Sequence, residues 1–338
     1  MESYFKCSLF KNKNFSLKDE FDFVQEEILH SEGNKFSKIE VQYKCKWDQK
    51  RDVDKSLPFA IIPIKDNLKL LEYTVSNFEK NNFLDFVNLI VVDDRSEEDI
   101  KSFCGDKNIN YLRVDNEKGF NFSMLNNIAS LVAHKLGGKQ VIFWNSDLWI
   151  DKIEYFKTLL QRHNDNKSTI SGSKLLYPFE SLNDEDSVNI STHFPHMKNG
   201  RYKGTVQFGG SRWIPVSSEI FNPIHYKRFA DKDHHTVNCD YGTHFVTGAL
   251  QVIELEWFIK NGGYNPSLSK LLQDVDLCLR ASEQNKKIMY FGKDIHFFHD
   301  ESFNHFSNKN EVKMDKQYNS DGFLFAQIWK NKVAQIIL

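Results

Sequence analysis

The chain has 338 residues, 40% hydrophobic and 27% charged, enough to bury a substantial core in one large domain, with or without appendages. The formal net charge of −2 provides no basic field, which argues against a nucleic-acid-binding protein. The five cysteines show no CxxC spacing and are odd in number, so we expect reduced thiols in a cytosolic protein. No apolar run approaches a membrane span, and the N-terminus lacks the apolar segment of a signal peptide.

The first part of the chain, residues 1–56, is polar and rich in lysine. We interpret it as an N-terminal extension that contains one helix, over Leu17 to His30.

Short apolar runs alternate with helical patterns over residues 57–150. Strands are expected over Phe59–Ile64, Val87–Val92, Asn110–Val114 and Val141–Trp144. Helices are expected between them, over Leu68–Lys80, Glu97–Phe103 and Ser123–Lys135. This alternation predicts an open, mostly parallel α/β sheet, in which ligands bind beyond the carboxyl ends of the strands. Neither GxGxxG nor a P-loop motif follows the first strand, which argues against a dinucleotide dehydrogenase and a P-loop NTPase.

The second half, residues 151–302, begins with a stretch rich in turns and histidines. Further strands are expected over 170–177, 205–208 and 287–291, and a helix over Glu254–Lys260. A C-terminal tail, residues 303–338, contains an amphipathic helix over Phe323–Val333.

Acidic residues follow two of the predicted strands. Asp93 and Asp94 end one strand, where they could cap the next helix or hydrogen-bond a nucleobase or ribose. Asp147 ends another, where it could be a turn residue or a ligand of Mg²⁺ or Mn²⁺ on a diphosphate.

Two more acids, Asp274 and Asp276, enter a helix just after the turn that contains Gly262 and Gly263. Asp276 stands one helical turn before Arg280, so we expect a structural ion pair there. Asp274 is the better candidate for a general base, which must be ionised and reach a hydroxyl.

Weaker candidates surround these acids. His299 follows an apolar strand, where it could be a packed residue or could complete the coordination of a metal on Asp147. The histidine spacing matches neither HExxH nor a C2H2 pattern, so zinc is not expected. Lys118 and either Asn126 or Asn127 could contact a nucleotide, although such residues are commonly exposed.

Taken in order, these motifs over residues 57–302 resemble the GT-A fold glycosyltransferases that use nucleotide sugars. The resemblance is greatest to family 2, the bacterial surface-polysaccharide and rhamnosyl type. The motifs are Pro63 with Asp66, VVDDRS at 91–96, Gly119 to Asn127, Asn145-Ser146-Asp147, VQFGG at 206–210, Thr247-Gly248-Ala249, Gly263 and QDVD at 273–276.

The resemblance implies a role for each matched position. It implies Asp274 as catalytic base, and Asp147 and His299 as ligands of Mn²⁺ or Mg²⁺. It implies a nucleotide-sugar site formed by Pro63, Asp66, Asp94, Lys118, Asn126, Asn145, Ser146, Gly248 and Gly263. The family's usual acid before the base is here Gln273, so we expect a lower pKa for Asp274 than in relatives, because a neighbouring like charge is missing.

The predicted function is an inverting transfer of a sugar from a UDP- or dTDP-sugar to a hydroxyl of a glycan or lipid-linked glycan, in bacterial surface polysaccharide synthesis. Residues 193–245 are expected on the acceptor side. Cytoplasmic location is expected, with contact to the inner face of the membrane through Phe323, Phe325, Ile328 and Trp329, unless these side chains pack against the domain. Three alternatives stay open: a retaining GT-A transferase, a sugar nucleotidyltransferase, and an inactive glycan-binding scaffold.

Overall fold

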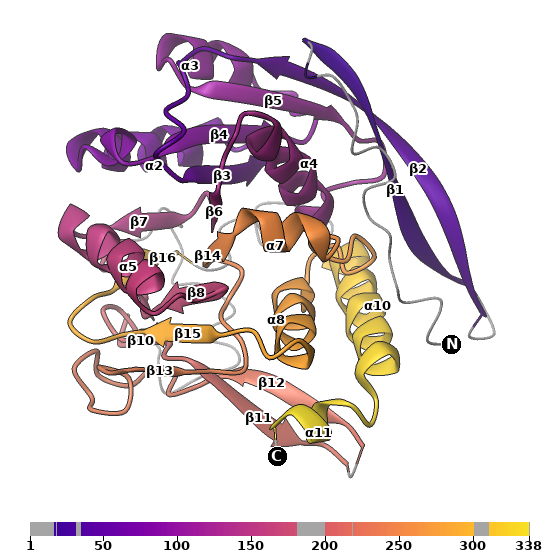
Figure 1. Ribbon diagram of the computed structural model, residues 1–338, viewed down its shortest axis with the longest axis vertical. Coiled ribbons are helices and arrows are strands. Elements are labelled where there is room, and N and C mark those ends of the chain that lie inside the picture. The colour runs from indigo at the N-terminus through magenta and orange to yellow at the C-terminus, as the bar shows by residue number, and fades with distance from the viewer. Residues whose placement is uncertain are drawn as a thin grey trace.

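A ten-stranded sheet crosses the protein in the order β1-β2-β5-β4-β3-β6-β14-β8-β15-β13 (Figure 1). The computed structural model describes residues 17, 19–31, 35–180, 200–217, 219–300 and 311–337. The central strands are β5 (Asn110–Asp115), β4 (Asn88–Asp93), β3 (Phe59–Ile64) and β6 (Gln140–Trp144). Each of these is parallel to its neighbour. Every residue of β3 and β4 is buried, as expected for parallel strands covered on both faces.

The helices of the first half confirm the predicted alternation. They are α2 (Leu68–Lys80), the short 3₁₀ helix η1 (Phe83–Asp85), α3 (Ile100–Asp106) and α4 (Phe122–Lys135). Asp99 caps α3 by accepting the Ser102 N–H, and Asn121 caps α4 by accepting the Met124 N–H. Helix α4 packs against β3, β4 and β6, so its N-terminus lies near the strands whose carboxyl ends carry the predicted site.

The second half extends the sheet and adds two smaller ones. Its strands in the main sheet are β14 (Leu250–Glu254), β8 (Ile170–Ser173), β15 (Ile288–Phe291) and β13 (Asp240–Gly242). Strands β10 (Val206–Phe208), β9 (Leu175–Leu176), β16 (Phe297–His299) and β7 (Leu148–Ile150) form a second sheet, and β11 (Ser211–Pro215) and β12 (Phe221–His225) form a hairpin. The helices here are α5 (Ile153–Asp165), α7 (Leu255–Lys260) and α8 (Gln273–Glu283).

The N-terminal region differs from the prediction. The helix expected over Leu17 to His30 is wrong: β1 (Glu20–Ser31) and β2 (Lys35–Asp48) form a long antiparallel hairpin. Side chains alternate between buried and exposed along both strands, with Phe21 and Phe23 inside, which is the period of a strand and not of a helix. Strand β2 also pairs with β5, so the hairpin continues the main sheet and projects from it (Figure 1).

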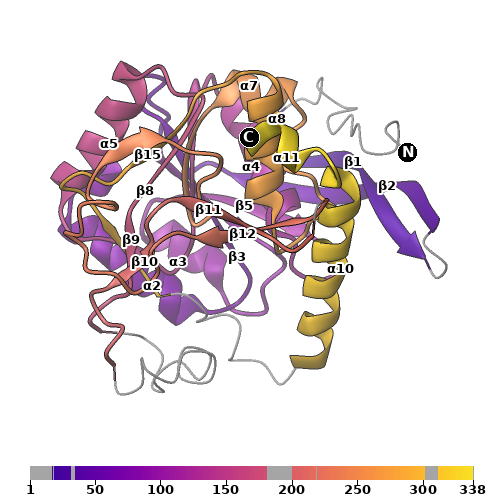
Figure 2. The ribbon, with the colours of Figure 1, turned by 90° about the horizontal axis from the view of Figure 1, so that it is seen from below.

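The C-terminal region contains two helices, α10 (Glu311–Trp329) and α11 (Val333–Ile337), instead of one helix over Phe323–Val333. Both views show α10 beside α8 (Figure 1 and Figure 2). Phe325 and Trp329 are buried, whereas Phe323 is 37% exposed, so the apolar face of α10 mainly packs against the protein. Among the described residues, no helix combines the length and the apolar composition needed to cross a membrane.

Candidate functional site

The carboxyl ends of β3, β4 and β6 bring the predicted donor-side residues to one edge of the sheet. Ile64 at the end of β3 lies opposite Asp93 at the end of β4. Asp94 follows directly, and its backbone N–H donates to the Ile64 carbonyl at 2.8 Å. Asn145 follows β6, which lies on the other side of β3. The segments after three neighbouring strands therefore border one region, as the parallel topology predicts.

The adjacent acids Asp93 and Asp94 have different environments. Asp93 accepts hydrogen bonds at 2.8, 2.5 and 2.9 Å from Ser96, Tyr111 and Arg113. Asp94 is fully buried, and neither of its carboxylate oxygens has a hydrogen-bond partner among the described residues. Burial raises the pKa of Asp94 to about 6. A buried acceptor without a partner is costly, so Asp94 is the member of the pair suited to an N–H or O–H of a ligand.

Two lysines lie near Asp94. The Lys65 ammonium donates to the Asp94 backbone carbonyl at 3.1 Å, and its charge lowers the pKa of Asp94, against the effect of burial. Burial lowers the pKa of Lys270, and the charges of Asp321 and Asp94 oppose this. Neither lysine is predicted as a binding residue, because a lysine whose partners are distant in sequence leaves no pattern. Together they place two lysine side chains near the Asp94 carboxylate.

Other predicted donor-side residues are held by protein contacts. Pro63 is buried within β3. The carboxylate of Asp66 accepts the Glu97 N–H at 2.7 Å and so joins two loops at the sheet edge. The Lys118 side chain is 51% exposed, with its ammonium 3.4 Å from a carboxylate oxygen of Glu27 on β1. Lys118 thus retains an exposed surface that a ligand could contact, and the binding roles of these residues stay predictions.

The asparagine pair on α4 also separates into two environments. Asn126 is buried and donates to the Phe122 carbonyl of its own helix at 2.8 Å. Asn127 accepts the Tyr264 N–H and donates to the Tyr264 carbonyl, both at 2.8 Å. Gly263 has a φ of +68°, and a Cβ there would lie 2.3 Å from the Asn127 side-chain oxygen. The structure therefore gives Asn127 and Gly263 a clear role in forming the turn before α8.

Asp274 lies at the start of α8 and contacts the predicted Gly248. One carboxylate oxygen accepts the Gly248 N–H at 2.6 Å, and the other accepts the Val275 N–H at 2.8 Å. Burial raises the pKa of Asp274, and these two N–H groups partly oppose the rise. Although position 273 is a glutamine and not an acid, the pKa of Asp274 is therefore above its ordinary value. That it is lower than in related enzymes stays a prediction. A half-buried carboxylate with a raised pKa is a stronger proton acceptor than an exposed one.

Asp276 has the structural role that its spacing predicts. One carboxylate oxygen lies 2.9 Å from the Arg280 guanidinium. The other accepts the indole N–H of Trp329 on α10 at 3.0 Å. Arg280 in turn donates to the carbonyls of Asn261 and Gly263, at 2.8 and 2.7 Å. Asp276 therefore connects α8 with both α10 and the glycine turn.

A second residue of α10 holds the segment before Asp274. Asp321 is fully buried, and one of its carboxylate oxygens accepts the backbone N–H groups of Lys270 and Leu271, at 2.9 and 3.1 Å. The sequence gives no sign of this contact, because Asp321 precedes the helix expected over Phe323–Val333 and is 51 and 50 residues from its two partners. Helix α10 thus fixes the backbone just before the candidate base Asp274.

The structure brings Asp147 and His299 together. His299 on β16 pairs with Leu148 on β7, which places its ring beside the preceding residue, Asp147. The imidazole Nε2 lies 3.1 Å from an Asp147 carboxylate oxygen and 3.3 Å from the Asn145 amide nitrogen. Both side chains are about nine-tenths buried. His296, by contrast, lies 3.4 Å from Asp151, and His305 is outside the described residues.

This pair fits a divalent cation. Two donor atoms in neighbouring positions of an octahedral ion, with bonds of about 2.1 Å, are separated by roughly 3.0 Å. The observed separation between His299 and Asp147 is 3.1 Å. In the part of the chain that the structure describes, no three His, Cys, Asp or Glu side chains gather as a metal cluster. The pair therefore suits an ion that takes its other ligands from phosphate and water, as Mg²⁺ commonly does.

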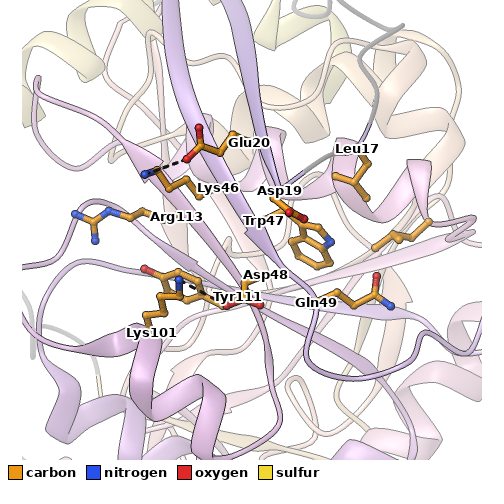
Figure 3. A pocket seen from close by; sticks show the side chains of 11 residues that line it. Leu17, Asp19, Glu20, Lys46, Trp47, Asp48, Gln49, Lys101, Tyr111 and Arg113 are labelled. Atoms are coloured by element: carbon orange, nitrogen blue, oxygen red, sulfur yellow. Dashed lines mark ion pairs between the residues drawn. The ribbon is translucent and has the colours of Figure 1, made fainter.

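A separate hollow of about 790 Å³ lies beside the N-terminal hairpin (Figure 3). Strand residues such as Trp47, Tyr111 and Arg113 line it together with Lys101. None of its lining residues belongs to the predicted site. Its position therefore does not bear on the chemistry of Asp94, Asp147 and Asp274.

Of the comparisons with known proteins, only the one with solved structures finds matches. No family model and no curated protein matches the sequence. Among solved structures, GalNAc-T7 with UDP, GalNAc and Mn²⁺ superposes over 72% of this chain and 43% of its own, with a TM-score of 0.51 and 14% identity. TarS from S. aureus covers 72% of this chain and 60% of its own, with a TM-score of 0.45 and 14% identity.

A third match is the mannosyltransferase PcManGT from Pyrobaculum calidifontis in complex with GDP-Man and Mn²⁺. It covers 71% of this chain and 56% of its own, with a TM-score of 0.43 and 11% identity. This chain thus spans less than half of GalNAc-T7. The likeness to GalNAc-T7 confirms the predicted fold class: the chain has the GT-A fold of nucleotide-sugar glycosyltransferases.

Proposed function

We propose that the protein is a divalent-metal-dependent glycosyltransferase that moves a sugar from a nucleoside-diphosphate sugar to a hydroxyl of a glycan acceptor. The observation that carries this proposal is the meeting of Asp147 with His299, at 3.1 Å, beyond a parallel strand of a GT-A sheet. GalNAc-T7 and PcManGT, whose structures contain Mn²⁺ with UDP or GDP-Man, support the same class of donor and metal.

On this proposal each site residue contacts a different part of the substrates. Asp94, whose carboxylate oxygens have no hydrogen-bond partner by distance and angle among the described residues, accepts a hydrogen bond from the base or ribose of the donor. Lys65 and Lys270 supply positive charge on the same side. Asp147 and His299 would hold Mn²⁺ or Mg²⁺, which supplies positive charge to the departing diphosphate. We propose a UDP- or dTDP-sugar as donor and a growing surface polysaccharide as acceptor.

Asp274 is the proposed general base. Its carboxylate takes the proton of the acceptor hydroxyl, whose oxygen forms a bond to the anomeric carbon. The bond from that carbon to the diphosphate oxygen breaks on the opposite face, and the anomeric configuration inverts. The N–H groups of Gly248 and Val275 each occupy one carboxylate oxygen and fix its direction. Because burial raises the pKa of Asp274, the acid limb of the rate profile lies above the pKa of an ordinary Asp.

The test is a turnover screen over nucleotide sugars with Mn²⁺ or Mg²⁺, repeated with Asp274→Asn and His299→Ala. We expect Asp274→Asn to lower kcat by about 10²- to 10⁴-fold while donor binding persists, since a general base contributes that much. EDTA should abolish turnover, and added Mn²⁺ should restore it. Unchanged turnover in Asp274→Asn would contradict the role of the base.

The same screen separates the alternatives. NMR of the product's anomeric centre distinguishes an inverting from a retaining transferase. Consumption of a sugar phosphate with a nucleoside triphosphate would indicate a nucleotidyltransferase. Nucleotide-sugar binding without turnover would indicate a glycan-binding scaffold.

A further inference from the structure

We propose that Gln207 is a positioning residue that holds His299 in the tautomer able to bind a divalent cation. This proposal rests on the metal role given to His299 above. Gln207 lies on β10, is 1% exposed, and touches His299 with both ends of its side-chain amide.

The orientation of the Gln207 amide is set by the backbone of His299. The amide nitrogen donates to the His299 carbonyl oxygen at 3.1 Å. A carbonyl oxygen only accepts hydrogen bonds, so rotating the amide by half a turn would place two acceptors against each other. The amide oxygen of Gln207 must therefore face the other contact, which is the His299 Nδ1 at 2.6 Å.

That contact decides which ring nitrogen carries the hydrogen. The Gln207 oxygen is an acceptor, so Nδ1 of His299 must be the donor. The imidazole that binds a metal is neutral and carries one N–H, so with that hydrogen on Nδ1 the lone pair is on Nε2. Nε2 is the atom that faces Asp147 at 3.1 Å and the Asn145 amide nitrogen at 3.3 Å. The lone pair is therefore directed to the proposed cation position.

With this tautomer, Asp147 and His299 are more favourably placed with a cation between them than without one. A lone pair 3.1 Å from a carboxylate oxygen is repelled by it, and a cation bound by both atoms removes that repulsion. Partners that fix the second nitrogen of a metal-binding histidine set its tautomer, and their loss weakens metal binding by about 10- to 100-fold. The Gln207 side chain supplies this partner in the fold.

The chain offers a matched control. Gln251 on β14 is also fully buried, with its amide nitrogen donating to the Val246 carbonyl at 2.8 Å and its oxygen accepting the Tyr264 hydroxyl at 2.5 Å. Replacing either glutamine by leucine removes a buried amide whose nitrogen donates to a backbone carbonyl and whose oxygen accepts a hydrogen bond. Only Gln207→Leu removes contacts to His299, so a difference between the two variants separates positioning from general destabilisation.

Binding of Mn²⁺ would be measured by electron paramagnetic resonance, alone and with UDP present, in wild type, Gln207→Leu, Gln251→Leu and His299→Ala. We expect Gln207→Leu to weaken Mn²⁺ binding by about 10- to 100-fold. We expect Gln251→Leu to bind within about twofold of wild type, because the contacts to His299 remain. Nitrogen NMR of the metal-free wild type, recorded at a pH where the imidazole is neutral, should show the hydrogen of His299 on Nδ1, and Gln207→Leu should show a mixture of tautomers.

Three results would overturn the proposal: wild-type Mn²⁺ affinity in Gln207→Leu, equal losses in both leucine variants, or an Nε2–H tautomer in the wild type. Absence of Mn²⁺ binding by the wild type in both conditions would overturn it as well. Mn²⁺ binding that depends on His299 and Gln207, without turnover of any nucleotide sugar, would support the positioning role and contradict the proposed function. Wild-type turnover of a nucleotide sugar, together with unaltered Mn²⁺ affinity in Gln207→Leu, would support the proposed function and contradict the positioning role.

Discussion

The β1–β2 hairpin and helix α10 lie outside residues 57–302, where the sequence motifs stand, yet each brings one buried carboxylate to the candidate site. In the hairpin this is Glu27, which accepts from Tyr43 and Gln25 and lies 3.4 Å from the Lys118 ammonium. In α10 it is Asp321, which accepts two backbone N–H groups just before Asp274.

The two carboxylates differ in what they hold. Lys118 is a long side chain, half exposed to solvent, and an ion pair of that kind contributes little free energy because water and salt screen it. The N–H groups of Lys270 and Leu271 belong to the backbone, and one fully buried oxygen accepts both. Their loss would leave two donors without an acceptor. We infer that α10 holds the segment before the proposed base firmly, whereas the hairpin contributes only a weak ion pair to Lys118.

Replacing Asp321 by Ala should have the largest effect. We expect the free energy of unfolding to fall by roughly 2–4 kcal/mol, because two backbone N–H groups lose their acceptor. Hydrogen exchange should accelerate at residues 268–276, and kcat should fall more than KM rises. Asp321→Asn keeps one acceptor oxygen and serves as the milder control in denaturant unfolding. Unchanged exchange in this segment would remove the distinction between the two regions.

Replacing Trp329 by Phe tests one hydrogen bond between α10 and α8 and leaves no large cavity. The substitution removes the indole N–H that donates to Asp276 at 3.0 Å but leaves the Arg280 ion pair. We expect a loss of about 1.5–3 kcal/mol in thermal or denaturant unfolding, the value of a hydrogen bond to a charged acceptor. The double variant with Asp276→Asn and Trp329→Phe completes the comparison. If it loses no more unfolding free energy than either single variant, the two side chains act as a pair.

Lowering the pH should weaken donor binding before it lowers the stability of the fold. Burial raises the pKa of Asp94 to about 6, so its carboxylate is protonated as the pH falls through 6. Donor binding, measured by calorimetry with UDP or dTDP, should weaken over this range because the acceptor is lost. The same group favours folding there, since the folded state binds its proton more tightly than the unfolded state does. Asp94→Asn should remove this pH dependence; a parallel loss of folding in wild type would contradict the assignment.

Replacing Glu27 by Gln should have the smallest effect. The change keeps an acceptor for Tyr43 and Gln25 but removes the charge beside Lys118. We expect at most about 1 kcal/mol in unfolding free energy, because the partner ammonium is exposed. Donor KM should change by a few-fold and kcat should not, and raising the salt concentration should reduce the difference. A loss as large as that of Asp321→Ala would show that the hairpin is as firm a support as α10.

Local sequence determined the part of the fold where pattern and burial agree. The runs 59–64 and 68–80 are a strand and a helix with the predicted bounds, because each pattern extends over its whole element. The pairing of Asp276 with Arg280 follows from helical spacing alone. The strand identity of Glu20–Ser31 was not predicted, because its buried face becomes polar at Gln25 and Glu27 and the apolar alternation is lost.

Only the tertiary structure decided which polar groups meet. Asp93 and Asp94 are equal neighbours in the sequence, and the difference between them comes from Tyr111 and Arg113 on the adjacent strand. The contacts of Asp321 with Lys270, and of Gln207 with His299, join residues whose separation along the chain leaves no periodic pattern. Hydrogen bonds and ion pairs depend on distances of a few ångströms, whereas a sequence reports mainly which side chains prefer to be buried.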